Sequence, residues 1–187
     1  MITVKIDLRP LVKALLFIGD QQRRAILRDA LDRSASAMRQ EAIRGIAEAT
    51  NIASADVRRV LSVKPSFGGM VAGVKAQSGW LAASYVGFGL ARQSSGISFA
   101  GWKGTAVLAR HGFIASMSSG HVGAFIRKGK GRFPLHQLFG PNPAKEMVRE
   151  DQPTAEKVML VARETFDKRW LVQTDRSVKQ AKSRFGL

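Results

Sequence analysis

Imidazole is the side chain that most often binds zinc or exchanges protons near neutral pH. The chain has three histidines within one stretch of 26 positions: His111, His121 and His136. A catalytic zinc site also needs closely spaced ligands and a base, commonly glutamate. The nearest carboxylate is Glu146, which is close along the chain only to His136. We therefore interpret the histidines as structural or surface residues and predict neither a metal nor another cofactor.

Several glycine-rich segments come close to phosphate-binding or nucleophile motifs, but each departs from its pattern. Gly123–Gly129 has five residues between its glycines where a phosphate loop has four, and Gly131 stands where a magnesium-binding hydroxyl belongs. Arg92 stands where a dinucleotide fingerprint starting at Gly87 needs its third glycine. Ser98 follows Gly96 as in a nucleophile elbow, but Ala100 stands at the second glycine and the segment is an expected strand with no acid nearby. These segments are better explained as turns, and we predict that the protein is not an enzyme.

The basic loop, residues 127–132, alternates cations with glycine. Its cations are Arg127, Lys128, Lys130 and Arg132. They could follow a phosphate backbone, meet an acidic surface of a neighbouring subunit, or form an ordinary solvated loop. Charge alone does not separate these three interpretations. Arg92, in an expected mobile loop over residues 87–96, is a further candidate contact. Phe125 and Phe133 flank the basic loop, and both are expected to face the core.

The net charge of +16 is unevenly distributed. Residues 61–140 contain 9 basic and no acidic side chains, and no Asp or Glu occurs between Val57 and Lys145. Such a surface repels copies of itself unless an anion lies nearby, and nucleic acid or an acidic protein would serve. A plain alternative is that the high isoelectric point aids solubility or reflects the composition of the proteome.

The length of 187 residues and a hydrophobic content of 45% suit one folded domain, residues 1–187. Cysteine is absent, which excludes disulfides and thiolate chemistry. The longest apolar runs, Ala14–Ile18 and Val158–Ala162, are too short to span a bilayer, so no membrane association is expected. Within this domain the sequence pattern predicts three regions: helical (1–61), β-rich (62–140) and helical (141–187).

Hydrophobic periodicity predicts a long helix over Gln21–Ala49, followed by a short turn capped by Ser54. Many residues of the long helix are small, which allows another element to approach closely. A second helix is expected after Asn142 or Thr154, either of which could cap it. Its apolar face comprises Met159, Ala162, Phe166 and Trp170, and its end, residues 176–187, is expected to be frayed.

The middle of the chain alternates apolar segments with glycine turns, which favours an antiparallel sheet or a small sandwich. The expected strands are Met70–Ala76, Leu81–Val86, Ile97–Trp102, Thr105–Ala109, Gly112–Met117 and Val122–Arg127. The last two should form a hairpin around the turn Ser118–Gly120. The predicted fold is therefore α+β, with a long N-terminal helix and a C-terminal helix packed on an antiparallel β-sheet.

The stretch 111–147 resembles the central signature of the minor tail protein Z family, the tail completion proteins of long-tailed bacteriophages and prophages. The matching residues are Gly120, His121, Gly123, Phe125, Arg127, Arg132, Pro134, Leu135, Leu138, Phe139, Gly140, Pro141 and Met147. A second match covers Asn51, Asp56, Val57, Arg58 and Val60. One departure is Gln137, where the family is expected to have glutamate. The matches cover somewhat under half of the chain, and none is a catalytic motif.

The resemblance implies a structural virion protein at the head-proximal end of the tail, made in the host cytoplasm, that supports head–tail joining. Its implied partners are further copies of itself in a ring, expected to be a hexamer, together with tail terminator, tail tube and neck proteins. The end of the phage DNA is a further candidate contact. From the charge alone, a stand-alone basic nucleic-acid-binding protein is the alternative.

Overall fold

The computed structural model describes residues 19–66, 71–118, 120, 122–127, 129, 131, 133–149 and 154–185. No helix within these ranges is both long enough and apolar enough to cross a membrane. Contacts group the chain into two compact units. Unit 1 consists of the described parts of Met1–Ala42, Leu61–Ala76 and Pro153–Leu187, and unit 2 of those of Ile43–Val60 and Gln77–Gln152. Each unit thus combines segments that are distant in sequence.

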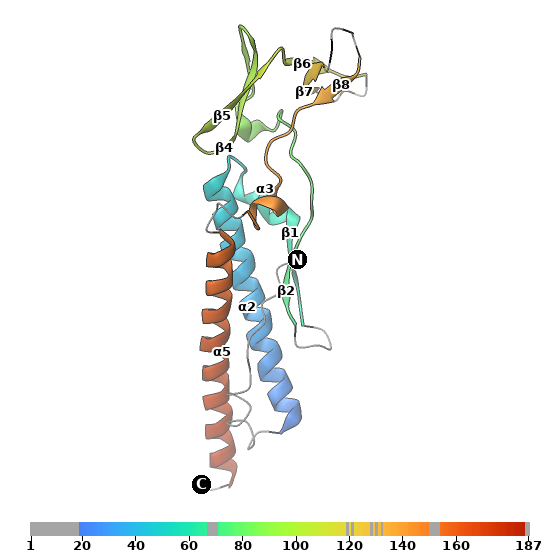
Figure 1. Cartoon of the computed structure of the whole chain (residues 1–187). Helices are drawn as coiled ribbons and strands as arrows, with labels where there is room; N and C mark the ends of the chain where they lie inside the picture. The colour runs from blue at the N-terminus through green and yellow to red at the C-terminus, as the bar shows by residue number, and fades with distance from the viewer. Residues whose placement is uncertain are drawn as a thin grey trace. The chain divides into compact units, whose positions relative to one another are not determined.

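Unit 1 is built on two long helices that run side by side, α2 (Asp20–Ala49) and α5 (Thr154–Phe185) (Figure 1). Hydrogen bonds join Gln22 to Ser177 and Ser34 to Ala162, so positions rise along one helix as they fall along the other. The two helices are therefore antiparallel. The predicted long helix is confirmed within one residue. The prediction of a frayed end from residue 176 is wrong, because α5 remains helical to Phe185.

The core between these helices contains the apolar face predicted for α5. Phe166 and Trp170 stack with ring centroids 5.9 Å apart and pack with Ile26 and Ala30 of α2. Small residues on α2 let α5 approach closely: the Ser34 hydroxyl is buried and donates to the carbonyl of Ala162 at 2.7 Å. Each helix buries one face against the other, and this packing stabilises both helices beyond what helix propensity alone provides.

An antiparallel hairpin completes unit 1, formed by β1 (Leu61–Lys64) and β2 (Gly73–Ala76). Polar side chains of α2 hold it. Nε of Arg39 donates to the carbonyl of Leu61 at 2.7 Å, and Asp32 accepts from the backbone N–H of Ser66 at 2.9 Å. The expected strand Met70–Ala76 is shorter than predicted, because residues 71 and 72 lie outside β2; residues 67–70 lie outside the described ranges.

Unit 2 contains the last turns of α2 and two three-stranded antiparallel sheets, in the orders β3-β4-β5 and β6-β7-β8. Its elements are α3 (Ser54–Val60), the 3-10 turn η2 (Val86–Phe88), β3 (Ala91–Gln93), β4 (Gly96–Trp102), β5 (Thr105–Arg110), β6 (Phe113–Ser116), β7 (Val122–Arg127), β8 (Leu135–Gln137) and α4 (Pro143–Glu146). The predicted hairpin is confirmed as β6–β7.

Two predictions for unit 2 are wrong. The segment Leu81–Val86 is not a strand: it makes one isolated bridge, from Ala82 to Phe139, and then turns into η2. The segment 87–96 is not simply a loop, because β3 within it pairs with β4 and Phe88 is fully buried. In place of the antiparallel sheet or small sandwich that was expected, the described strands form three separate sheets, counting β1–β2. The α+β class itself is confirmed, with both long helices packed against antiparallel strands.

Candidate functional site

The first half of the resembling stretch forms a hairpin whose glycines have geometric roles. Gly120 has φ +80°, a left-handed conformation that favours glycine, and its N–H donates to the carbonyl of Met117 at 2.9 Å. Gly123 is buried opposite Ala115 in the β6–β7 ladder. Phe125 is buried as predicted, with its ring centroid 6.2 Å from that of Phe113. These positions build the hairpin and its core.

The second half, residues 138–142, is bonded to the segment 81–88. The N–H of Leu138 donates to Ala124 at 2.8 Å, and its carbonyl accepts from Ala83 at 2.9 Å. Gly140 donates to the carbonyl of Leu81 at 2.7 Å. A Cβ at Gly140 would overlap the buried ring of Phe88, so glycine is required by close packing.

Two signature prolines, Pro134 and Pro141, differ in their burial. Pro141 is buried and packs against Gly101 of β4, where a Cβ would meet Cδ of the proline at 2.5 Å. Pro134 is exposed. Asn142 caps α4 by accepting from the backbone N–H of Ala144 at 3.0 Å, as the sequence predicts for a helix start there.

The predicted contact cations are only partly described, and the two that are described lie in different sheets. Arg92 is exposed on β3, and Arg127 is exposed at the end of β7 with its guanidinium 4.8 Å from the Phe113 ring centroid. Lys128, Lys130, Arg132 and His121 lie outside the described residues.

Phe133 corrects a prediction, because it is 71% exposed rather than facing the core. Pairing of β8 with β7 begins at Leu135, opposite Arg127. Phe133 therefore precedes the ladder, and the sheet does not bury its ring.

The most distinctive surface feature of unit 2 is a hollow of about 600 Å³ that we term the tryptophan cavity. It brings two indoles together with three cations and one carboxylate. Its lining comprises Ala49, Trp80, Trp102, Lys103, Thr105, Val107, Lys145, Glu146 and Arg149. These described residues make no catalytic set, but aromatic faces beside cations are suited to binding.

Polar contacts hold one wall of the tryptophan cavity in place. Nε1 of Trp102 donates to Oε1 of Glu146 at 3.0 Å, and Arg149 donates to Oε2 of the same carboxylate at 3.2 Å. Glu146 is only 7% exposed. The ammonium of Lys145, another lining residue, lies 4.8 Å from the centroid of the Trp80 ring. The buried carboxylate is thus paired, whereas Lys103 and Lys145 are exposed.

Sequence reasoning missed this cavity because its residues come from separate segments. Trp80 and Lys145 are 65 positions apart and belong to no local motif. The available signal was that two of the chain's three tryptophans lie in the middle of the sequence, where no Asp or Glu occurs. Which indole stays exposed depends on packing that no local pattern specifies.

Tyr85 is the described titratable group whose pKa clearly departs from its ordinary value. Its hydroxyl donates to Oδ2 of Asp56 at 2.5 Å and accepts from the N–H of Ala53 at 3.2 Å. Burial and then the bond to Asp56 raise the pKa of Tyr85 above its ordinary 10.0. Arg59 pairs with the same Asp56 at 2.8 Å. Through its hydrogen bond to Asp56, the protonated phenol of Tyr85 links α3 to the segment before η2.

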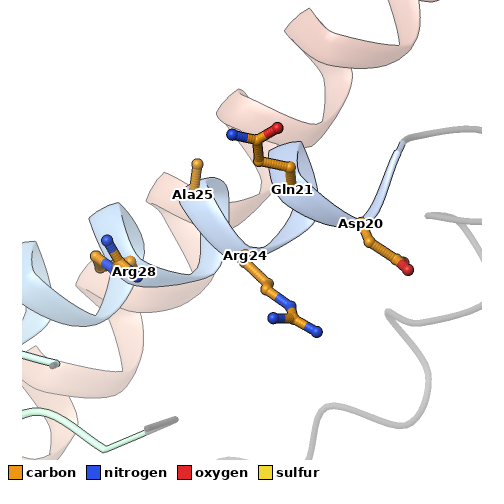
Figure 2. Close-up of a pocket in the computed structure, with 5 residues that line it drawn as sticks. All are labelled: Asp20, Gln21, Arg24, Ala25 and Arg28. Atoms are coloured by element: carbon orange, nitrogen blue, oxygen red, sulfur yellow. The ribbon is translucent and has the colours of Figure 1, made fainter. Parts of the chain in front are cut away.

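Two other hollows are less informative. Figure 2 shows one of about 530 Å³ whose lining residues, Asp20 to Arg28, all come from the first turns of α2. Another, of about 600 Å³ in unit 2, is lined mainly by polar residues and glycines around Ser95 and His111, and the N–H of His111 donates to the carbonyl of Ser95 at 2.9 Å. Among the described residues, no group of three or more His, Asp or Glu side chains could hold a metal ion.

Likeness in sequence or structure to a known protein would indicate a family independently of the signature residues. The resemblance of residues 111–147 rests on the signature itself and remains a prediction. No family model, curated protein or solved structure matches this chain.

Proposed function

We propose that this protein is a structural virion component that completes the head-proximal end of a long phage or prophage tail and supports head–tail joining. It would act as a closed ring, expected to be a hexamer, with tail terminator, tail tube and neck proteins as neighbours. Rings arise from heterologous contacts whose rotation closes, and a tubular tail provides the matching symmetry.

The signature within residues 111–147 is the observation that carries this proposal. Its described members have geometric and packing roles: Gly120 lies in the turn, Phe125 is buried in the core, and Gly140 leaves room for the ring of Phe88. A resemblance made of such positions supports a shared scaffold rather than a shared reaction. The excess of cations supports anionic neighbours, which acidic protein surfaces or DNA could supply.

The decisive experiment is removal of the gene from an inducible phage or prophage, followed by electron microscopy of the particles. We expect filled heads and finished tails that are not joined, and recovery of joined particles when the gene is supplied in trans. Joined, infectious particles in its absence would contradict the proposal. Loss of tails altogether would instead place the protein earlier in tail assembly.

The second candidate is a stand-alone nucleic-acid-binding protein, favoured by the two indoles and the cations of the tryptophan cavity. It predicts normal particles without the gene and salt-sensitive DNA binding by the isolated chain. The particle experiment therefore separates the two functions.

A further inference from the structure

The tryptophan cavity has the size and composition of a ligand site. Its volume of about 600 Å³ falls within the range of roughly 300–1,000 Å³ that small-molecule sites occupy. Its lining residues all belong to unit 2. The site can therefore be considered within one compact unit.

Trp80 provides an accessible aromatic face. The residue is 52% exposed, although an indole is one of the costliest side chains to leave in water. By contrast, Trp170 is buried in the core of unit 1. A half-exposed indole inside a hollow is suited to stacking with another flat ring.

Cations line the same cavity, and its described lining contains no free anion. The Lys145 ammonium lies over Trp80 at 4.8 Å, and Lys103 is exposed with no ion pair to any residue that the structure describes. Glu146, the one carboxylate among the described lining residues, is buried and already accepts bonds from Trp102 and Arg149. A ligand would thus meet positive charge beside the aromatic face.

The backbone holds the site in shape. Lys103 is in the turn between β4 and β5, and its N–H donates to the carbonyl of Ala49 at 3.1 Å. The side-chain bond from Trp102 to Glu146 connects the end of β4, next to that turn, to α4. Preorganisation of this kind lowers the ordering cost of binding.

We propose that the tryptophan cavity binds single-stranded nucleic acid, with an unpaired base stacked on Trp80 and the adjacent phosphates at Lys145 and Lys103. Stacking requires a base whose face is free, which a duplex interior does not offer. An acidic peptide would satisfy the cations but would leave the indole without a matching ring. This binding could hold whether or not the chain acts in a tail.

The test is titration of the full chain with a short fluorescein-labelled oligothymidylate, followed by anisotropy and by tryptophan emission. We expect quenching of tryptophan emission that is largely lost in W80A, with emission from buried Trp170 remaining as an internal reference. W80A should weaken binding by about 5- to 150-fold, the range expected for loss of one stacked base, whereas W80F should retain most of the affinity.

Charge variants separate specific phosphate contacts from general attraction. The double change K103Q/K145Q should reduce the slope of log affinity against log salt by about 1.4, because each single-strand phosphate contact contributes about 0.7. K64Q/K75Q removes equal charge from the β1–β2 hairpin, where both lysines are exposed, and should leave that slope nearly unchanged.

Three results would overturn the proposal. These are equal affinity of W80A and the native chain, equal loss in both double variants, or competition by polyglutamate or polyphosphate as effective as that by unlabelled oligothymidylate. The last would indicate a purely ionic site for an acidic partner. Because W80A can also be supplied in trans in the particle experiment, failure of nucleotide binding can be distinguished from failure of the tail role.

Discussion

The indole N–H of Trp102 donates to Oε1 of Glu146 at 3.0 Å, linking the end of β4 to α4 across 44 positions of sequence. The carboxylate is almost completely buried and also accepts from Arg149. A buried charge is tolerated only when it is paired and hydrogen-bonded. This relationship explains how the one carboxylate among the described lining residues of the tryptophan cavity can lie in a strongly basic unit without opposing an anionic ligand.

Replacing either partner of this bond should destabilise unit 2. We expect E146A to cost about 1–3 kcal/mol, because the half-buried indole N–H of Trp102 loses its acceptor. W102F should also be destabilising, and the double variant should cost less than the sum of the two. Urea unfolding of the three variants measures this coupling.

E48A is the matched control for that cycle. Glu48 pairs with Arg44 at 3.2 Å, but both side chains are more than half exposed. Such surface pairs contribute about 0–1 kcal/mol. Additive effects of E146A and W102F, or an equal cost for E48A, would contradict the assigned role of the buried bond.

Close approach of α2 and α5 should depend on Ser34. Its buried hydroxyl donates to Ala162 at 2.7 Å, so S34A should lower the free energy of unfolding by about 0.5–1.5 kcal/mol. S34L should cost more, since overpacking a tight helix contact typically costs about 1–3 kcal/mol. Thermal unfolding followed by circular dichroism would measure both.

Ser36 provides the comparison, because its exposed hydroxyl donates to the backbone carbonyl of Asp32 in the same helix at 2.9 Å. S36A should change the unfolding temperature little. If S34L were as stable as the native chain, the antiparallel contact between α2 and α5 would not be a close one.

Gly140 should not tolerate a methyl group. Its missing side chain leaves room for the ring of Phe88, which is fully buried. G140A should therefore destabilise the protein by about 1–3 kcal/mol through overpacking. A Cβ at Gly79 would meet no described atom within 4 Å, so G79A is the control and should be close to neutral. Equal urea midpoints for the two variants would rule out the packing argument.

Tyr85 should make stability depend on alkaline pH. Burial and the bond to Asp56 raise the pKa of its phenol above 10.0, so the folded state favours the protonated form. The resulting stability is fully present below the unfolded pKa of about 10 and is lost as pH rises from there through the raised folded pKa.

Comparing urea midpoints at about pH 8 and about pH 11 tests this, because these values bracket the ordinary tyrosine pKa. The loss on going to the higher pH should be smaller in Y85F, which has no phenol to ionise. An identical pH dependence in Y85F and the native chain would show that other groups cause the loss.

Sequence alone determined those features that depend on neighbours along the chain. The period of apolar residues specified α2 and the buried face of α5, because a helix repeats its faces every three to four positions. The turn at residues 118–120 and its flanking alternation specified the β6–β7 hairpin in the same way. The uneven distribution of charge is likewise a property of the sequence by itself.

Tertiary structure decided whatever depends on contacts between distant segments. It placed Leu81–Val86 against residues 138–140 rather than in a regular strand, and it exposed Phe133 while burying Phe125. Only the packing of β4 and α4 brings Trp102 to Glu146, and with them Lys145 to Trp80. Burial is a property of the whole folded unit, so no local pattern could have shown which indole would remain open to a ligand.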